Sequence, residues 1–426
     1  MLYNISNNKF FNGEIMEFLA RSKEGKVLKD DALRLGNEAK NEKRKDPSVV
    51  NGTLGTFYYE DGSFHTHNVV KKVFNTLSDD DVYLYSTPDG GEDFQNAAFN
   101  HLFRSYRSFI EETMDIRGIA TPGGTGALVS SVTTTLDEGE TLLIPVPCWG
   151  PYFGIAKARN LNVETFFMFD NDKFNINGFI EKANDIIKRQ GKLVFFLNDP
   201  CNNPTGYTMT KEEMDALINY LNSTKVPCVL VYDCAYMDVA SEGLVETREK
   251  LKEFSNANDN VVISLCLSYS KTYFIYGERL GAQIIIGKNK EQVKKMYEAS
   301  SYLARNTWSN CNHGMISLVT KIDKDKSLRL ELDSELEVVW NTLKKRSEIF
   351  LKEAKEVGLY TYPYNGGFFI SIPVKKNIYL CDILKKEEKI YLLPVSNVIR
   401  VAICSISSQD LKGLAGRIKK VIDKYD

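Results

Sequence analysis

From about Ile116 to Ile286 the sequence alternates short apolar runs, rich in β-branched residues, with longer amphipathic stretches. Such runs are typical of strands buried on both faces, and amphipathic stretches between them are typical of helices. Strands that alternate with helices form βαβ units, so we expect an α/β fold with a mostly parallel sheet between helices. The expected strands are Thr141–Val146, Asn162–Phe169, Leu193–Leu197, Cys228–Tyr232, Val261–Leu267 and Gln283–Ile286, with helices such as Asn177–Lys188 and Lys211–Asn222 between them.

The two ends of the chain have a different pattern. Residues from about Glu14 to Lys45 predict one or two amphipathic surface helices, with a break at Gly25. From about Gly314 to Glu356 we expect long charged helices, followed by shorter strands. A chain of 426 residues can bury two cores. We therefore expect residues 66–313 to form a large α/β domain, and residues 1–65 with 314–426 to form a smaller α+β domain.

Composition excludes several classes of protein. Lys plus Arg number 54 and Asp plus Glu 56, a balance that argues against binding nucleic acid through a bulk basic field. No apolar run reaches the roughly 18 residues of a membrane helix, and the first residues lack a signal-peptide layout. Eight scattered cysteines without a Cys-x-x-Cys pair indicate reduced core residues, so we expect a cytoplasmic protein with no nucleic-acid or membrane partner.

His65 and His67 are spaced like a metal-binding pair, but no third ligand lies at a useful distance along the chain. We expect them to lie on a hairpin with both imidazoles pointing outward, and we expect no metal site.

The segment Cys266–Gly281 carries the strongest chemical signal. Lys271 lies in the turn that leaves a buried strand, where partial desolvation disfavours the ammonium form and provides a nucleophilic amine. Ser268 and Arg279 offer a short donor and a planar cationic fork, which together suit a phosphate. From these residues alone, a surface lysine and arginine beside a strand would be the simpler interpretation.

Three other turns follow expected strands. The glycine-rich turn Thr121–Ala127, which includes Gly124 and Thr125, opens a helix and could bind a phosphate, although a plain tight turn is the alternative. Asn203 lies in an Asn-Pro-Thr-Gly loop, which could also be only a turn. Asp233 and Tyr236 end the next strand, where open parallel sheets bind ligands; Asp233 could instead cap a helix.

The pattern Ser-x-Ser-Lys-x-x-x-x-Tyr-Gly-Glu-Arg-x-Gly, the Asn-Pro-Thr-Gly loop and Pro-x-Trp-Gly at Pro147–Gly150 occur in this order. Together they resemble class I aminotransferases, the pyridoxal-phosphate enzymes of fold type I, and most closely the aspartate and aromatic subgroup. The resemblance extends from about Gly55 to Arg400. It implies a seven-stranded-type sheet in the large domain, pyridoxal 5'-phosphate as cofactor, and a homodimer with shared active sites.

The resemblance also implies a role for each matching residue. Lys271 would form the Schiff base with the cofactor and act as the general base. Asp233 would pair with the ring nitrogen, Trp149 would stack on the ring, and Asn203 and Tyr236 would contact its hydroxyl. The residues implied for the phosphate are Gly124, Thr125, Ser268, Arg279 and, from the neighbouring subunit, Tyr85.

For the substrate, the resemblance assigns the α-carboxylate to Arg400 and the backbone of Gly55, beside Trp149 and Asn203. Arg305, in Arg-x-x-Trp-Ser-Asn, would cross the dimer interface to a side-chain carboxylate. The chain departs from the family pattern after Ser-Asn, where Cys311-Asn312 replaces the usual Pro-Pro, and at three positions nearer the cofactor. Gly123 replaces a serine of the phosphate loop, and Tyr152 and Asn198 stand where aspartate-type members often carry histidines.

These matches predict an aminotransferase that moves the amino group of an L-amino acid, of aspartate or aromatic type, to a 2-oxo acid such as 2-oxoglutarate. Two alternatives stay open at this point. The first is another pyridoxal-phosphate reaction, such as β-elimination or decarboxylation, because the cofactor does not determine the outcome. The second is a cofactor-binding regulatory protein, which the short, mixed-charge segment before Gly55 disfavours.

Overall fold

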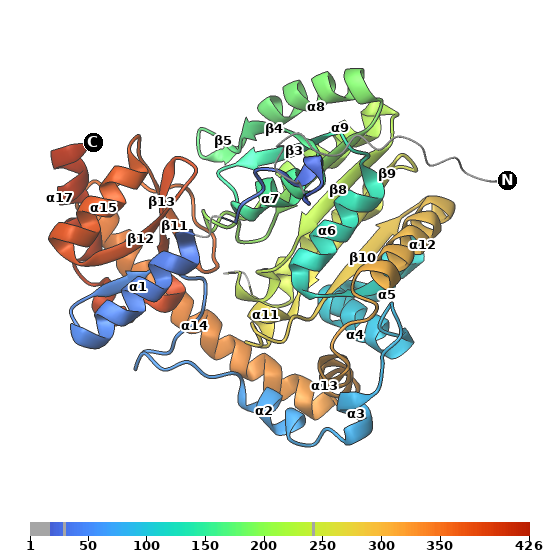
Figure 1. The fold of residues 1–426 in the computed structure, drawn as a ribbon, viewed down its shortest axis with the longest axis horizontal. Coiled ribbons are helices and arrows are strands. Elements are labelled where there is room, and N and C mark those ends of the chain that lie inside the picture. The colour runs from blue at the N-terminus through green and yellow to red at the C-terminus, as the bar shows by residue number, and fades with distance from the viewer. Residues whose placement is uncertain (1–17, 29–30, 241–242) are drawn as a thin grey trace, which may run out of the picture.

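The computed structural model describes residues 18–28, 31–240 and 243–426. A seven-stranded sheet forms the centre of the larger part of the molecule, in the order β2-β10-β9-β8-β7-β3-β4 (Figure 1). Strand β10 is antiparallel to both its neighbours, and the other pairs are parallel. The strands are β2 (Asp115–Thr121), β3 (Thr141–Val146), β4 (Asn162–Phe167), β7 (Leu193–Asn198), β8 (Cys228–Asp233), β9 (Val261–Ser268) and β10 (Gly281–Gly287). The predicted α/β fold with a mostly parallel sheet is therefore confirmed.

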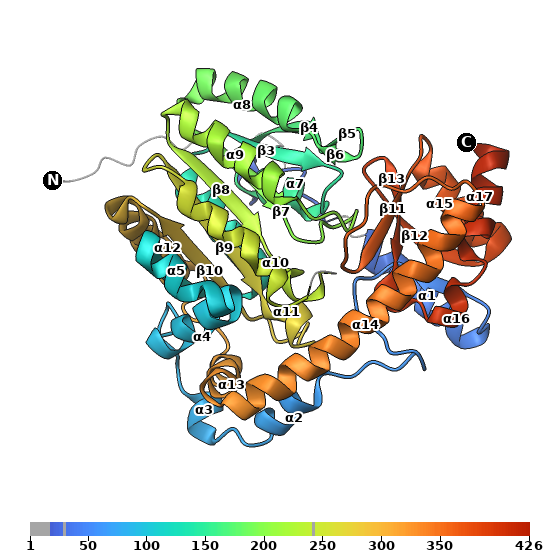
Figure 2. The ribbon, with the colours of Figure 1, turned by 180° about the vertical axis from the view of Figure 1, so that it is seen from behind.

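Helices cover both faces of this sheet (Figures 1 and 2). Alternating residues of the strands pack against the helices on opposite faces. Phe196 of β7 packs with α6 and α7, whereas Phe195 packs with α8 and α9. Because both faces of the sheet are buried, the sequences of its strands are nearly continuous apolar runs. The covering helices are α4 (Glu92–Phe103), α6 (Gly123–Thr135), α7 (Pro151–Ala158), α8 (Ile176–Gln190), α9 (Lys211–Thr224), α12 (Lys290–Thr307) and α13 (His313–Lys324).

A second sheet, of four strands, lies at the other end of the molecule in the order β1-β12-β13-β11 (Figure 1). Its strands come from both ends of the chain, since β1 pairs in parallel with β12. The strands are β1 (Val50–Gly52), β11 (Phe369–Pro373), β12 (Ile390–Val395) and β13 (Val398–Ala402). The helices around it are α1 (Asp31–Lys45), α15 (Asn377–Glu388), α16 (Ser408–Leu411) and α17 (Leu414–Tyr425).

Helix α14 (Lys326–Glu356) runs between the two sheets (Figures 1 and 2). Its Leu332 and Leu336 belong to the core of the large sheet, and its Phe350 and Ala354 belong to the core of the small sheet. The core of the large sheet thus continues beyond residue 313, where we expected the large domain to end. We propose that the two domains divide within α14.

The remaining elements are short. They are η1 (Arg21–Lys23), α2 (Asn68–Phe74), α3 (Asp79–Tyr83), η2 (Arg104–Tyr106), α5 (Arg107–Thr113), β5 (Phe169–Asp170), β6 (Lys173–Phe174), η3 (Met237–Val239), α10 (Glu246–Glu249), η4 (Lys250–Asn256), α11 (Tyr269–Thr272) and η5 (Ile403–Ser405). Of the N-terminal helices expected from about Glu14, the residues before Phe18 lie outside the described part. Across residues 18–28, 31–240 and 243–426, no helix combines the length and apolar character needed to cross a membrane.

The prediction for His67 was wrong. Its imidazole is buried rather than outward, because it precedes α2 and lies between two partners from distant segments. Its Nε2 is 3.0 Å from the carbonyl oxygen of Thr272, and its Nδ1 is 3.4 Å from Glu335. His65 stacks on Tyr59, with ring centroids 3.8 Å apart. In the described residues no group of three or more metal-binding side chains comes together.

Candidate active site

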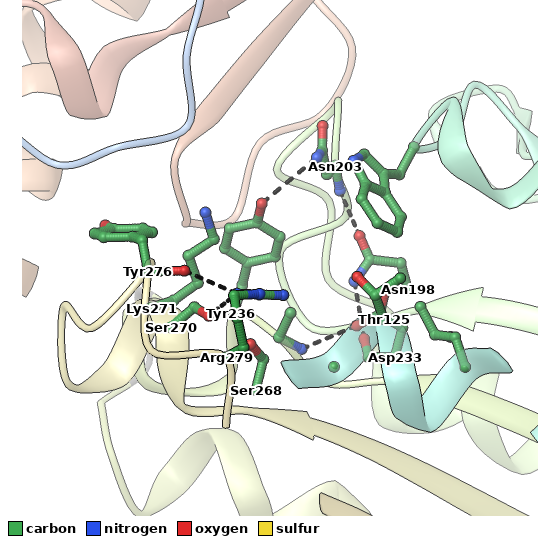
Figure 3. A pocket seen from close by; sticks show the side chains of 14 residues that line it. Thr125, Asn198, Asn203, Asp233, Tyr236, Ser268, Ser270, Lys271, Tyr276 and Arg279 are labelled. Atoms are coloured by element: carbon green, nitrogen blue, oxygen red, sulfur yellow. Dashed lines mark hydrogen bonds between the residues drawn. The ribbon is translucent and has the colours of Figure 1, made fainter. Parts of the chain in front are cut away.

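A cavity of about 190 Å³ lies at the carboxyl ends of β7, β8 and β9, beside the start of α6 (Figure 3). Because parallel strands place their carboxyl ends at one edge, residues far apart in the sequence meet there. An adjoining groove of about 1520 Å³ reaches the small sheet. The residues that line the cavity are Gly124, Thr125, Leu128, Trp149, Asn198, Asn203, Asp233, Ala235, Tyr236, Ser268, Ser270, Lys271, Tyr276 and Arg279.

Lys271 lies on α11, the single turn of helix after β9. Its Nζ donates to the carbonyl oxygen of Gly55 at 2.7 Å and lies 4.7 Å from the ring centroid of Tyr276. No carboxylate pairs with the amine among the ion pairs of the described residues. Burial lowers the pKa of Lys271 to about 8, and the positive charges of Arg400 and Arg279 act in the same direction. Near neutral pH an appreciable fraction of this amine is therefore uncharged and nucleophilic.

Asp233 is buried at the end of β8. Its Oδ2 accepts a hydrogen bond from the Tyr152 hydroxyl at 2.6 Å, and its Oδ1 accepts one from the Ala235 amide at 3.2 Å. Burial raises the pKa of Asp233 to about 6, and the two hydrogen bonds oppose that rise because they favour the carboxylate. At pH 7 the cavity thus holds a mostly ionised carboxylate facing it from one side.

The phosphate-binding features predicted from the sequence converge at the start of α6. Gly123 has φ +73°, and a Cβ built on it would lie 2.5 Å from Arg279 Nη2. A Cβ on Gly124 would lie 3.0 Å from the Ser268 Cβ. Any side chain at residue 123 would therefore displace the guanidinium of Arg279. This packing and the positive φ favour glycine at residue 123.

Arg279 itself is held by its neighbours while its side chain stays exposed. Its Nη1 donates to the Ser270 hydroxyl at 3.1 Å and to the carbonyl oxygen of Tyr276 at 2.8 Å. These bonds aim the guanidinium at the cavity (Figure 3). The first amide groups of α6 have no partner within the helix. Together with Ser268 and Arg279 they form what we call the anion cradle, which offers N–H donors as well as a positive charge.

Asn203 connects the cavity to the small sheet. Its backbone amide donates to Asn198 Oδ1 at 2.6 Å, and its Nδ2 lies 3.5 Å from the Tyr236 hydroxyl (Figure 3). Its Oδ1 accepts from Arg400 Nη1 at 3.1 Å. Asn198 in turn donates from Nδ2 to the carbonyl oxygen of Asp233 at 2.8 Å. Asn198 therefore braces both the loop and the strand end, where the sequence showed only a departure from the family pattern.

Arg400 comes from β13 of the small sheet and is buried at the wall of the larger groove. Its Nη2 donates to the carbonyl oxygen of Thr53 at 2.5 Å, and its guanidinium lies 4.2 Å from the ring centroid of Phe369. Its Nε has no hydrogen-bond partner in the described residues. No carboxylate of the described part pairs with it, so this buried cation has unused capacity for an anion.

The other predicted residues divide into two groups. Trp149 and Gly55 line the same groove as Arg400, and Trp149 packs edge-on against Tyr152 at 5.5 Å between ring centroids. Tyr85 and Arg305 lie away from the cavity: the Tyr85 side chain is 90% exposed, and Arg305 is exposed near the end of α12. The structure thus brings together every predicted residue except the two that we expected to act across a dimer interface.

No role in the site was predicted for Ser270 and Tyr276, although both lie inside the sequence pattern around Lys271. Tyr276 forms one wall beside Lys271, and its hydroxyl accepts a hydrogen bond from the Phe57 amide at 3.2 Å. The position of Tyr276, three residues before Arg279 and on the turn that leads to β10, is the sequence feature that could have indicated its role. Its contact with Phe57 is not visible from the sequence.

The residues present fit pyridoxal phosphate. A partly uncharged amine, a buried carboxylate and an anion cradle surround one cavity of about 190 Å³. These are the groups that an aldehyde, a ring nitrogen and a phosphate require. Lys271 on α11 would hold the aldehyde end, and Ser268 at the end of β9 would hold the phosphate. Asp233 at the end of β8 would hold the ring nitrogen, and Trp149 would cover one ring face.

Comparisons with known proteins agree with this geometry. An aspartate aminotransferase of Haemophilus influenzae is 25% identical over 402 residues, which cover 92% of this chain and 98% of the relative. A solved structure of an aminotransferase from Anaerococcus prevotii superposes with a TM-score of 0.90 at 29% identity, covering 96% of this chain and all of that one. An aromatic-amino-acid aminotransferase from Burkholderia pseudomallei, solved covalently bound to pyridoxal phosphate, shares the fold at 21% identity with a TM-score of 0.79, covering 95% of this chain and 100% of that one.

The model of one protein family, described as aminotransferase class I and II, matches residues 49–418. The match includes both sheets and every residue of the cavity. The chain therefore belongs to the class I and II aminotransferase family and is a pyridoxal-phosphate-dependent transaminase.

Proposed function

We propose that this enzyme moves the amino group of an L-amino acid, of aspartate or aromatic type, to a 2-oxo acid such as 2-oxoglutarate. The observation that carries the proposal is the placement of Arg400. It is a buried guanidinium with an unpartnered Nε, and it lines the same groove as the Lys271 amine. A planar cationic fork can hold the α-carboxylate that every such amino acid and 2-oxo acid carries.

Pyridoxal phosphate, when bound, supplies an aldehyde that reacts with amines and a ring that takes up the electron pair released at the substrate's α-carbon. We assign the attachment of its aldehyde to Lys271. With its amine free, Lys271 would be the general base that removes and returns the α-proton of the substrate. Its lowered pKa supports this role, since a base must be uncharged when it accepts the proton.

The other residues hold the reacting groups in place. Asp233, ionised at neutral pH, would keep the ring nitrogen protonated, and Tyr152 holds that carboxylate from behind. Arg279, Ser268 and the α6 amides would hold the phosphate. Arg400 and Asn203 would orient the substrate carboxylate, so that the α-proton faces Lys271.

The substrate class can be tested with a panel of amino donors, with 2-oxoglutarate as acceptor, using the wild-type enzyme and Arg305→Ala. We expect Arg305→Ala to lower kcat/KM about 10- to 100-fold for aspartate and glutamate, because it removes a charged hydrogen bond, and to leave aromatic donors unchanged. Unchanged kinetics with dicarboxylates would contradict the role of Arg305. Ammonia or CO₂ released without any acceptor would contradict transamination as the main reaction.

We also propose a homodimer in which Tyr85 and Arg305 serve the partner's site. Both are exposed in the single chain, and Tyr85 lies beside the exposed Tyr83 and Leu84. Mixing inactive Lys271→Ala subunits with Arg305→Ala subunits tests this. If sites are shared, each mixed dimer contains one site with both residues intact, so aspartate transamination should recover. Without recovery after confirmed subunit exchange, the sites are not shared.

We place the enzyme in the cytoplasm. The support is that all eight cysteines are free and buried, as expected in a reducing compartment. Fractionation of cells that express the full chain, with transaminase activity as the marker, tests this placement. Activity confined to an oxidising compartment would contradict it.

A further inference from the structure

The turn that carries Lys271 has little internal support. Helix α11 contains only four residues, and at its end the Tyr273 amide donates to the Tyr269 carbonyl oxygen at 3.0 Å. A single helical turn is not stable by itself, because so short a helix forms too few hydrogen bonds to offset the ordering of its backbone. The position of the Lys271 backbone therefore depends on contacts with other segments.

One of these contacts is a side-chain bond at the next residue. The Thr272 hydroxyl donates to Asp238 Oδ2 at 2.5 Å, and both side chains are buried. Asp238 lies in η3, two residues after Tyr236. The bond thus joins the turn behind Lys271 to the turn behind Tyr236, whose side chains face each other in the cavity (Figure 3). It lies outside the cavity lining.

Asp238 is itself held by two further groups. Its Oδ2 also lies 3.0 Å from His101 Nε2, and its Oδ1 accepts from Arg248 Nη2 at 2.5 Å. Although burial raises the pKa of Asp238, the adjacent His101 and Arg248 outweigh it and hold the pKa well below the usual value. Asp238 is therefore an ionised acceptor, and the Thr272 hydroxyl is the donor.

His101 and Arg248 attach this carboxylate to the body of the large sheet. His101 lies on α4, and its Nδ1 has no partner among the described residues, so its proton is on Nε2 and points at Asp238. Burial lowers the pKa of His101 to about 4, which keeps the ring neutral. Arg248 Nε donates to the Leu102 carbonyl oxygen at 2.9 Å, at the end of the same helix. His101 and Arg248 thus hold the Asp238 carboxylate in place independently of its hydrogen bond with Thr272.

We propose that Asp238 and Thr272 are positioning residues, which hold the Lys271 turn at the distance from Tyr236 and the cofactor cavity that catalysis requires. This inference rests on the proposed function of Lys271. The network is buried beneath the site, and neither residue touches the cavity. Its effect on the reaction passes through the placement of the Lys271 amine.

The test compares Thr272→Val with Thr272→Ser, which keeps the hydroxyl. Thr247→Val is the matched control: this buried threonine donates to the Gly243 carbonyl oxygen at 2.6 Å, away from α11. Two quantities are measured: kcat of the holoenzyme, and the rate of reductive methylation of Lys271 in the cofactor-free enzyme at pH 8, followed by peptide mass spectrometry. Borohydride reduction of wild-type holoenzyme tests separately whether Lys271 carries the cofactor.

We expect Thr272→Val to lower kcat about 10-fold with little change in KM, since small misplacements of a reacting group are costly. We expect its Lys271 methylation at pH 8 to fall about 10-fold, because a looser turn solvates the amine and raises its pKa. Thr272→Ser and Thr247→Val should behave like the wild type.

Wild-type values for Thr272→Val in both measurements would overturn the proposal, and so would equal losses in Thr272→Val and Thr272→Ser. If Thr272→Val does not fold, Thr272→Ala removes the same hydroxyl without adding an apolar group. If neither folds, the bond serves stability alone and the proposal fails. If the wild-type enzyme forms no borohydride adduct at Lys271 but Thr272→Val still lowers the methylation rate relative to the wild type, the proposed function is refuted. The positioning contact is not.

Discussion

Tyr152→Phe should change the protonation of Asp233 without changing the shape of the site. The substitution removes only the hydroxyl that donates to Asp233 Oδ2 at 2.6 Å. Tyr152 is fully buried and packs on Phe196, so the ring stays in place and no water replaces the donor. The lost hydrogen bond favoured the carboxylate, so its removal raises the pKa of Asp233 further above the value of about 6 that burial produces.

The magnitude follows from the strength of the bond. A hydrogen bond to a charged group contributes about 1.5–3 kcal/mol. Since 1.36 kcal/mol corresponds to a factor of ten, the proton affinity of Asp233 should rise about 10- to 100-fold. At pH 7 the wild-type carboxyl is mostly ionised, whereas in the variant at least about half is protonated. A protonated Asp233 cannot favour a charged ring nitrogen, so kcat at pH 7 should fall with the ionised fraction, by about 2- to 10-fold.

The assay is infrared difference spectroscopy of the cofactor-free enzyme, titrated between pH 4 and 9, with Asp233→Asn subtracted to assign the carboxyl band. We expect the wild-type midpoint near pH 6 and the midpoint of Tyr152→Phe at higher pH. Tyr207→Phe is the matched control, because its hydroxyl donates to the carboxylate of Glu213 instead. A midpoint in Tyr152→Phe at or below that of the wild type would refute the reasoning.

Further predictions concern the amine, the cradle and the substrate. Methylation of Lys271 in the cofactor-free enzyme should rise with pH to a midpoint near 8, because the uncharged amine is the reactive form; a midpoint near 10.5 would contradict the desolvated site. Lys271→Ala should lower turnover at least about a thousandfold and lose the borohydride adduct, and an adduct elsewhere would exclude the assigned lysine. Gly123→Ser should weaken cofactor binding about tenfold or more, measured by equilibrium dialysis, since its Cβ displaces Arg279 and φ is +73°. Arg400→Lys should raise KM for donor and acceptor alike about 10- to 100-fold, because lysine lacks the planar fork; a change for only one of them would contradict a shared carboxylate site.

The sequence predicted the large sheet well because burial on both faces leaves a strong signal. The run Cys228–Tyr232 became β8, with one more residue at its end, and Val261–Leu267 became β9. Several residues of the cavity could be brought together from the sequence for a related reason. Asn203, Asp233 and Lys271 lie at or after the ends of β7, β8 and β9, and parallel strands bring their carboxyl ends to one edge whatever their separation along the chain.

Features that depend on distant partners could not be predicted. His67 looked like a surface residue because its partners, Thr272 and Glu335, lie far along the chain. The bond between Asp238 and Thr272 joins two turns that neither periodicity nor motif connects. The antiparallel direction of β10, between β2 and β9, could not be predicted either, since an apolar run does not indicate the direction of a strand.

The small sheet has a consequence for how the enzyme is made. Lys271, Asp233 and the start of α6 precede α14 in the chain, whereas Arg400 is on β13, which follows it. Strand β1 is translated long before its parallel neighbour β12 and can pair with it only once β12 has emerged. During synthesis, the segments that line the cavity at the large sheet therefore all emerge before the strand that carries Arg400 and completes the small sheet.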